Sequence, residues 1–224
     1  MRALFVTGTG TDIGKTYVSA TIASYMRKKN LNIAYYKAAV SGALSIETSD
    51  AGVVRDRAGL KQETNSLLSY LYKEPLSPHL ASRQEGRFAS LEQIKQDFFK
   101  LAKNYDYILS EGAGGIVCPV VYEDGNKLFY EDIIKALGMP CVIAADAGLG
   151  TINHSVLSYE YLKSRGIEVK GFILNRYDAD NLMHQDNLKM IEEITSSKVI
   201  ATIGQNAEHA DLRYAPFEEY FDEI

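Results

Sequence analysis

The sequence predicts an α/β fold in which a mostly parallel central sheet is covered by helices on both faces. Short apolar runs alternate along the chain with longer segments of helical period. Strands that alternate with helices pair in parallel through right-handed crossovers. The 224 residues include 46% apolar side chains, and no linker-like segment divides them, so we expect residues 1–224 to form a single domain.

The predicted elements follow from this alternation. The strands are residues 3–7, 32–37, 105–110, 140–145, 169–175 and 198–203. The helices are residues 15–29, 90–102, 131–137, 151–164 and 181–195. The helix at 90–102 opens with Ser90 and Gln93 at the spacing of a capping box. Ligands of such sheets bind beyond the carboxyl ends of the strands, so the residues that follow each strand are the functional candidates.

The charge and the apolar pattern argue against several classes of function. The formal net charge is -5 and no long run of Lys and Arg occurs, which disfavours binding to nucleic acid or to an anionic membrane. The N-terminal apolar run is too short for a signal peptide, and no window approaches the ~20 apolar residues of a membrane span. We therefore expect the protein to stay in the cytoplasm.

Cysteine and histidine give no sign of a metal centre. Cys118 and Cys141 lie in apolar surroundings without a Cys-x-x-Cys spacing, so we expect buried free thiols rather than a disulfide. The histidines show no metal-ligand spacing, and none is assigned to catalysis: His79, His154, His184 and His209.

A glycine-rich segment, residues 8–16, follows the first strand and reads Gly-Thr-Gly-Thr-Asp-Ile-Gly-Lys-Thr. Glycines let backbone N–H groups point at phosphate oxygens, and the following helix adds its positive N-terminal end. Lys15 would neutralise the outer phosphates, and the Thr16 hydroxyl would bind magnesium. The segment is one residue longer than the usual P-loop pattern, and the alternative is a turn without a ligand. The interpretation as a phosphate loop predicts a P-loop NTPase-like three-layer sandwich.

Residues 6–16 resemble the extended phosphate loop of dethiobiotin synthetases, which usually reads Thr-Gly-Thr-Asp-Thr-x-x-Gly-Lys-Thr, with Gly10 in place of the usual Asp. Residues 36–42 are similar to the family's Tyr-Lys-Pro-x-x-Ser-Gly segment, with Ala38 in place of Pro. Further similar segments follow in family order: residues 49–51, 77–79, 111–115, 149–154 and Asn175. The resemblance covers roughly residues 1–175 and thins beyond them.

The resemblance implies an ATP-dependent ligase of biotin biosynthesis. In this family, carbon dioxide adds to one amine of 7,8-diaminononanoate, and the carbamate formed attacks the γ-phosphate of ATP. The second amine then displaces phosphate and closes the ring of dethiobiotin. Such a reaction needs a magnesium triphosphate clamp, cations for the developing charge, and a holder for the two amines.

The family's catalytic and metal-binding positions map onto this chain residue by residue. Magnesium would be held by Thr16, Asp50 and Glu111, hard oxygen ligands that suit this ion. Lys15 and Lys37 would be catalytic, with Lys37 holding the carbamate and the γ-phosphate as a point charge.

The same resemblance implies the binding residues. ATP would contact Asp12, Ile13, Gly14, Lys15, Thr16, Tyr17, Asp50, Glu111, Gly112, Ala113, Gly114, Asn175, Gly204, Gln205 and Asn206. The diamine would contact Thr11, Lys37, Ser41, Leu149, Gly150 and Asn153. The family segment that corresponds to the last three reaches across a two-fold interface to the substrate's carboxylate tail, so we expect a homodimer. A helix N-terminus suits such an anion.

Several of these residues also have a plain structural interpretation. Asp50 and the two residues before it would cap the helix that follows. Lys37 just past a strand, and Glu111 in a turn, would be solvated charges. Asn175 would be a turn residue. Gly204 stands where the family usually has Pro to frame the base, which leaves the base preference open.

Other functions remain as alternatives. A partition-type (MinD/ParA-like) ATPase acting on a protein partner shares the extended loop, but Gly10 occupies the position of its early lysine. An amidoligase of the cobyrinate diamide type would bring a glutamine-hydrolysing domain, for which there is no room. A degenerate module without turnover is supported only by Gly10, Ala38 and Gly204. The acidic, aromatic residues 217–221 would form a closing helix with one buried face or meet a partner.

Overall fold

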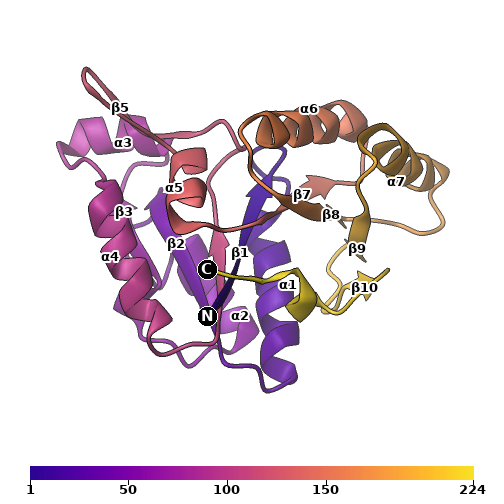
Figure 1. Cartoon of the computed structure of the whole chain (residues 1–224), viewed down its shortest axis with the longest axis horizontal. Helices are drawn as coiled ribbons and strands as arrows, with labels where there is room; N and C mark the ends of the chain where they lie inside the picture. The colour runs from indigo at the N-terminus through magenta and orange to yellow at the C-terminus, as the bar shows by residue number, and fades with distance from the viewer.

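The computed structural model describes residues 1–224 and contains a nine-stranded sheet with helices on both faces (Figure 1). The strands are β1 (Arg2–Gly8), β2 (Ile33–Ser41), β3 (Leu68–Tyr72), β4 (Tyr107–Glu111), β5 (Pro119–Glu123), β6 (Asn126–Phe129), β7 (Cys141–Asp146), β8 (Val169–Asn175), β9 (Val199–Ile203), β10 (Asp211–Leu212) and β11 (Asp222–Glu223). The helices are α1 (Lys15–Lys28), α2 (Asp50–Ala58), α3 (Pro78–Glu85), α4 (Leu91–Ala102), α5 (Tyr130–Leu137), α6 (Thr151–Ser164) and α7 (Leu182–Thr195). Two short 3-10 helices are η1 (Thr64–Ser66) and η2 (Phe217–Tyr220).

The strand order of the main sheet is β10-β9-β8-β7-β1-β4-β2-β3, with β11 against β1. All of these strands run parallel except β10 and β11, which pair antiparallel with β9 and β1. The predicted mostly parallel α/β sheet is therefore confirmed.

Two apolar clusters fill the space between the sheet and its helices. Along β1, Ala3 and Phe5 belong to the cluster under α4, α5, α6 and α7, whereas Leu4 and Val6 belong to the cluster under α1 and α2. This alternation is the two-residue period of a strand that is buried on both faces.

The C-terminal segment closes the core beside the N-terminus (Figure 1). Phe217 in η2 and Phe221 are buried in the cluster of α1 and α2. β11 then pairs with β1 at Arg2 and Ala3, and β7 pairs with β1 only from Phe5 onward. Of the two alternatives for this end of the chain, the structure has the closing one, as the short 3-10 helix η2 and the two-residue strand β11 against β1.

The predicted strands and helices all form, with ends that move by a few residues. The prediction that the second strand ends at Lys37 is wrong, because β2 continues to Ser41. Lys37 pairs in register with Glu111 on the neighbouring strand β4, and this opposite charge allows a lysine inside a buried strand.

Several elements were not predicted: β3, α3, the hairpin β5–β6 and the short strands β10 and β11. The hairpin has a clear signal in hindsight, because Asp124 and Gly125 form its two-residue loop and Gly125 takes a φ of 76°. It packs on α3 at the side of the molecule that carries the carboxyl ends of β2 and β3 (Figure 1).

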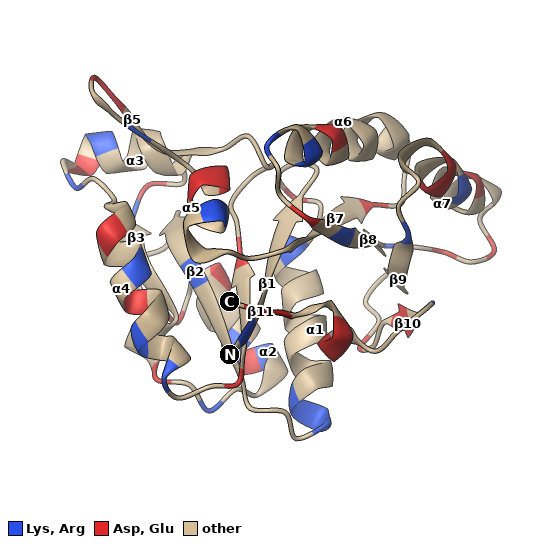
Figure 2. Ribbon diagram, in the orientation of Figure 1, with Lys and Arg blue, Asp and Glu red and all other residues tan.

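Acidic and basic residues are interspersed on the outer helices, while the central strands carry few charges (Figure 2). None of the helices combines the length and the apolar character that a membrane crossing requires.

Candidate active site

The phosphate loop connects β1 to α1 at the carboxyl edge of the sheet. Gly14 precedes α1 with a φ of 90°, and a Cβ at this position would lie 2.1 Å from Nδ2 of Asn175. Only glycine satisfies both the left-handed backbone and this close approach. Lys15 is buried, and its Nζ donates to the carbonyl oxygen of Gly10 at 2.7 Å. The loop therefore wraps around the end of the lysine side chain.

Lys37 is buried and forms the centre of a cluster of charges that runs from the buried Glu111 to the half-exposed Asp50. Its Nζ lies 2.7 Å from Oδ2 of Asp50 and 2.8 Å from Oε1 of Glu111. Glu111 is fully buried, and it also accepts hydrogen bonds from the Thr16 hydroxyl at 3.0 Å and the Tyr35 hydroxyl at 3.0 Å. Four elements, β2, β4, α1 and α2, thus bring these side chains together.

The electrostatics keep Lys37 and Asp50 charged. Burial by itself lowers the pKa of Lys37, but the carboxylates of Glu111 and Asp50 outweigh it and the net shift is upward. Burial likewise raises the pKa of Asp50, but the Lys37 ammonium outweighs it and the pKa is lowered. At Lys15 burial dominates and the pKa is lowered, although Glu111 opposes this shift.

The capping alternative for residues 48–50 is confirmed at Ser49, which occupies the N-cap position of α2 without a side-chain cap hydrogen bond. Asp50 begins the helix, and its carboxylate accepts from Lys37. The solvated-charge alternatives for Lys37 and Glu111 are wrong. Lys37 is 2% exposed and Glu111 is 0% exposed, so neither is a solvated surface charge.

The carboxylates of Asp50 and Glu111 both accept from the Lys37 ammonium, and the Thr16 hydroxyl donates to the same Glu111 oxygen. No cluster of three or more His, Cys, Asp or Glu side chains could enclose a metal ion by itself. Magnesium is usually bound by one or two carboxylates together with phosphates and water, so this oxygen set fits a magnesium ion that arrives with a nucleotide.

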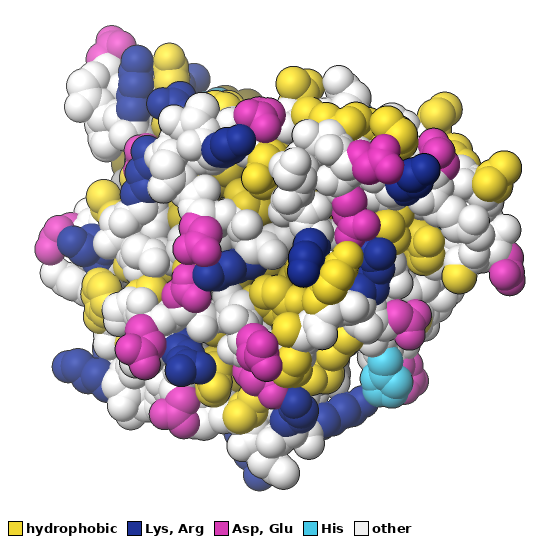
Figure 3. All heavy atoms as spheres, turned by 45° about the vertical axis from the view of Figure 1, so that its right-hand side comes forward, with side chains coloured by type: hydrophobic (Ala, Val, Ile, Leu, Met, Phe, Trp, Pro, Cys, Tyr) yellow, Lys and Arg dark blue, Asp and Glu magenta, His cyan; other side chains and the backbone are white.

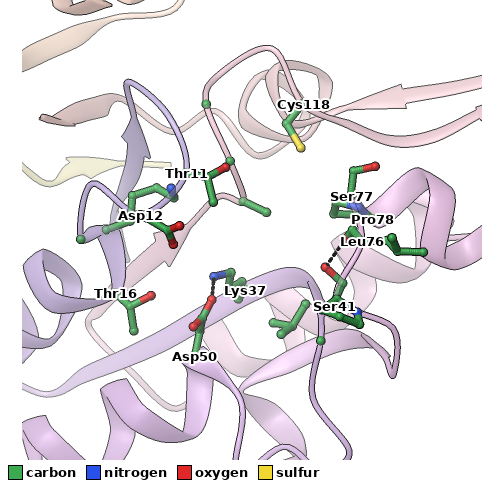
Figure 4. Close-up of a pocket in the computed structure, with 18 of the residues that line it drawn as sticks. Thr11, Asp12, Thr16, Lys37, Ser41, Asp50, Leu76, Ser77, Pro78 and Cys118 are labelled. Atoms are coloured by element: carbon green, nitrogen blue, oxygen red, sulfur yellow. Dashed lines mark hydrogen bonds and ion pairs between the residues drawn. The ribbon is translucent and has the colours of Figure 1, made fainter. Parts of the chain in front are cut away.

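A cavity of about 980 Å³ opens above this cluster (Figure 4). Thr11, Asp12, Thr16, Lys37 and Asp50 lie on one side of it, and a second group lies opposite: Ser41, Leu76, Ser77, Pro78 and Cys118. The predicted residues that line the cavity are Thr11, Asp12, Gly14, Lys15, Thr16, Tyr17, Lys37, Ser41, Asp50, Ala113 and Gly114. Such a cavity has room for a triphosphate and a second, smaller ligand.

Ser41 has a defined orientation at the far side of the cavity. Its hydroxyl donates to the carbonyl oxygen of Leu76 at 2.6 Å. The proton of Ser41 is therefore used, and its oxygen can serve a ligand only as an acceptor, which suits an amine. The loop with Leu76 is held close because Gly42, at a φ of 82°, packs against Pro75.

The remaining predicted residues lie outside the lining of the cavity. Ile13, Glu111 and Gly112 are not among the lining residues, and Asn175 donates from Nδ2 to the carbonyl oxygen of Ile13 at 2.9 Å. The loop after β9, with Gly204, Gln205 and Asn206, is connected to α1 by a hydrogen bond from the Tyr17 hydroxyl to the Ala207 carbonyl. Leu149, Gly150 and Asn153 begin α6, and Leu149 is 92% exposed.

Sequence reasoning missed several residues of the site. Tyr35 stands two residues before Lys37, on the same face of β2. The two-residue period of a strand could therefore have predicted that Tyr35 lies beside Lys37 in the site. Arg57 and Arg176 line the cavity, and no pattern marked them. Cys118 also lines it; burial raises the pKa of its thiol to about 11. Both Cys118 and Cys141 are buried and free, as expected.

Comparisons with known proteins agree with this geometry. A family model described as an AAA domain matches residues 2–211. The chain is 51% identical over 202 residues to the ATP-dependent dethiobiotin synthetase BioD of Brachyspira hyodysenteriae, covering 90% of this chain and 91% of the relative. It is 42% identical to that of Clostridium novyi (95% and 92% covered) and 39% identical to that of Clostridium botulinum strain Loch Maree (100% and 99% covered).

More distant solved structures share only the fold. The MinC:MinD cell division protein complex of Aquifex aeolicus matches with a TM-score of 0.58 at 18% identity, covering 92% of this chain and 82% of that chain. A ParA family ATPase of Chlorobium tepidum matches with a TM-score of 0.57 at 15% identity, covering 92% and 85%. Chloroplast FtsY of Physcomitrella patens gives 0.54 at 16% identity, and the match spans 95% of this chain and 61% of that chain. The predicted P-loop NTPase-like fold is thereby confirmed.

The likeness to the synthetases extends well past residue 175, where the recognisable motifs had thinned. Identities of 39–51% over nearly full lengths are far above those of the structural neighbours. The chain therefore belongs to the family of ATP-dependent dethiobiotin synthetases.

Proposed function

We propose that this protein closes the ureido ring of dethiobiotin from 7,8-diaminononanoate, carbon dioxide and ATP, giving ADP and phosphate. The observation that carries the proposal is the position of Lys37, buried between the phosphate loop and Ser41 and paired with Asp50 and Glu111. A fixed cation at that place serves both an attacking carbamate and a γ-phosphate. The enzyme is an ATP-dependent ligase that forms C–N bonds.

The reaction proceeds in three steps. One amine of the diamine attacks carbon dioxide, forms an N–C bond, loses a proton and becomes a carbamate. A carbamate oxygen then attacks the γ-phosphorus, the bond to ADP breaks, and a carbamic-phosphoric anhydride results. The second amine attacks the carbonyl carbon and loses a proton, and phosphate leaves with its bonding electrons. Two N–C bonds to one carbon make the cyclic urea.

The chain's own side chains stabilise the charge of the second step. Lys37 would pair with the carbamate and the transferring phosphoryl group, and Lys15 would pair with the outer phosphates. Hydrogen bonds hold Lys15 at the phosphate loop and Lys37 between Asp50 and Glu111, which places both cations beside the cavity. Burial excludes water from Lys37, which strengthens its interactions.

ATP is the co-substrate, and we propose that it binds as its magnesium complex. Magnesium, when bound by Thr16, Asp50 and Glu111, would neutralise charge on the β- and γ-phosphates. Backbone N–H groups of residues 12–17 would cradle the phosphates, and residues 112–114 would approach them from β4. Asn175 and residues 204–206 are proposed to contact the base.

The diamine is proposed to lie between Thr11, Lys37 and Ser41. The acceptor character of Ser41 supports this position, because an amine offers N–H donors. The carboxylate tail would reach Leu149, Gly150 and Asn153 of a second subunit, since these residues lie away from the cavity of their own chain.

A homodimer is accordingly part of the proposal. Exposed hydrophobic side chains occur at the start of α6 and on α6 and α7: Leu149, Leu157, Leu182 and Met183. Figure 3 shows hydrophobic side chains along the upper part of the face that carries these helices. Such a surface supports an interface between two copies of the chain. We also propose that residues 1–224 act as one domain and that the enzyme works in the cytoplasm.

The partition-type ATPase is not favoured. The proteins of that kind that this chain resembles share 15–18% of its residues, and a likeness at that level concerns the fold alone. Gly10 also replaces the early lysine of the loop.

The test is phosphate release by the purified protein with MgATP, with bicarbonate and 7,8-diaminononanoate added separately and together, and mass spectrometry of the products. We expect release only when both are present, together with a cyclic urea. Release that does not depend on the diamine would reject the proposal in favour of another ATPase.

A further inference from the structure

Arg176 makes two contacts that join different parts of the molecule. It follows β8 directly, lines the cavity and is 43% exposed in its side chain. Its Nη2 donates to the carbonyl oxygen of Asp12 in the phosphate loop at 2.9 Å, and its Nη1 lies 2.5 Å from Oδ2 of Asp146 at the end of β7. One planar guanidinium therefore bridges the phosphate loop and the neighbouring strand end.

The backbone on both sides of this bridge is unusual. Asp12 has a φ of 60° and Arg176 has a φ of 55°, so two non-glycine residues in the left-handed region face each other. That conformation costs free energy and persists where surrounding contacts hold it. The Arg176 bond to Asp12 and the adjoining Asn175 bond to Ile13 are such contacts.

Asp146 continues the connection toward α6. Its second carboxylate oxygen, Oδ1, accepts from the backbone N–H of Gly148 at 2.8 Å. On the opposite side, the buried Asn187 donates from Nδ2 to the carbonyl oxygens of Ala147 at 2.9 Å and Gly148 at 3.1 Å. The turn that precedes Leu149 is thus held from both sides.

We propose that Arg176 is a positioning residue that sets the shape of the phosphate loop and, through Asp146, the shape of the turn at residues 147–150. Loss of the bridge loosens both segments together and weakens nucleotide binding. The consequence for the diamine rests on the proposed function, because only there does the segment starting at Leu149 hold the substrate tail.

The geometry requires arginine. The two bridging contacts use different nitrogen atoms of one rigid fork, and a lysine ammonium on a flexible stem cannot reproduce this spacing. Arg176→Lys keeps the positive charge beside the cavity but loses the bridge, which separates a bridging role from a simple effect of charge.

The test is titration of the full-length protein with ADP, in Arg176→Ala, Arg176→Lys, Asp146→Ala and the double variant Arg176→Ala/Asp146→Ala. We expect each single variant to weaken ADP binding by about tenfold, because each breaks the bridge between Asp12 and Asp146. The double variant should lose no more ADP affinity than either single variant, since Arg176→Ala and Asp146→Ala remove the same bridge. Hydrogen exchange measured by mass spectrometry should rise in residues 10–14 and 147–150 together.

Arg165→Ala is the matched control. It removes an arginine of similar exposure with one carboxylate partner, Glu131, at the other end of α6. It should leave ADP binding unchanged. A melting curve for each variant separates loss of the fold from loss of the bridge, and Arg176→Lys repeats the test if Arg176→Ala does not fold.

Three results would overturn the inference. The first is ADP affinity in Arg176→Ala equal to that of the parent, and the second is a double variant in which the two effects multiply. The third is a fall in kcat with ADP affinity preserved, which would make Arg176 a direct contact of the reacting groups. Because ADP binding needs no diamine, a parent protein that binds ADP but forms no dethiobiotin rejects the proposed function and not the bridge.

Discussion

The proposed reacting centre and the proposed outer binding segments of this protein are built differently. At the centre, Lys37, Glu111 and Asp50 are joined by contacts of 2.7 and 2.8 Å; Lys37 and Glu111 come from the neighbouring strands β2 and β4, and Asp50 begins helix α2. The outer segments, residues 149–153 and 204–206, line no part of the cavity. Leu149 is 92% exposed, whereas Lys37 is 2% exposed.

The two regions are proposed to perform different tasks, namely stabilisation of developing charge and recognition of the ends of a ligand. Groups that stabilise developing charge must be fixed before the reaction, and a folded single chain achieves this by pairing them in register, as at Lys37 and Glu111. Groups that recognise the ends of a ligand can be completed later, by the ligand itself or by a second subunit. Each of the following experiments acts on one of these two regions.

The largest effect is expected from Lys37→Ala. It removes the fixed cation, so kcat should fall by about 10³-fold while ADP affinity stays within about threefold. Lys15→Ala, by contrast, should lose nucleotide binding itself. Steady-state kinetics and ADP titration distinguish the two. A raised KM for the diamine with kcat preserved would contradict the role given to Lys37.

The Lys37 variant needs a stability control. Breaking a buried pair leaves Glu111 without its cation, which costs about 3–5 kcal/mol of the free energy of unfolding. Lys37→Met combined with Glu111→Gln removes both charges, and its Tm should recover much of that loss. Its turnover should stay low. Recovery of turnover together with Tm would mean that Lys37 serves only the fold.

The same contrast explains what the sequence could predict. The long strands were recognised from their short apolar runs. Lys15 followed from the glycine-rich loop between a strand and a helix, and Glu111 followed from its place at a strand end. From the sequence, Lys37 was placed just past its strand. A lysine is expected to be exposed to solvent unless the residue that pairs with it on the neighbouring strand is known. Arg57 and Arg176 were missed because their roles depend on contacts between residues far apart in the sequence. The glycine-containing turn at Gly125 was a local signal that went unused.

A second experiment examines the wall of the cavity through Cys118. Burial raises the pKa of its thiol to about 11, although Lys15 and Lys37 oppose this shift. The thiol is therefore protonated below that pH, and the reactive thiolate is a fraction of about 10⁻³ at pH 8. Alkylation by iodoacetamide should be a few hundredfold slower than for an exposed thiol with a pKa of about 8.5.

Peptide mass spectrometry over a pH series measures this rate. The rate should rise about tenfold per pH unit through pH 8–10. Cys141 lies in the core, far from the cavity lining, and serves as the internal reference for unfolding. Rapid alkylation of Cys118 at pH 8 while Cys141 stays unmodified would show that the wall is more open, or the thiol more acidic, than this geometry implies.

Leu149→Glu addresses the outer region. If a second subunit covers this exposed side chain, a buried carboxylate without a partner should weaken the dimer and raise the KM for the diamine by about tenfold or more. ADP binding should not change. Sedimentation and steady-state kinetics measure the two effects, and Leu44→Glu, at another highly exposed leucine, is the control. An unaltered dimer and KM would remove this segment from the substrate site.

The smallest effect is expected from Tyr17→Phe, which tests how the loop after β9 is held. The tyrosine hydroxyl donates to the Ala207 carbonyl, and the Arg57 guanidinium lies 4.2 Å from the ring centroid. Phenylalanine keeps the ring and its stacking on Arg57, so only the hydrogen bond is lost. A neutral hydrogen bond contributes about 1 kcal/mol, and the KM for ATP should rise about fivefold with kcat unchanged. Inhibition by inorganic tripolyphosphate, which has no base to meet residues 204–206, should be the same in both proteins. Equal weakening of ATP and tripolyphosphate would instead mean that Tyr17 supports the phosphate loop, and the two regions would then be less separate than their geometry indicates.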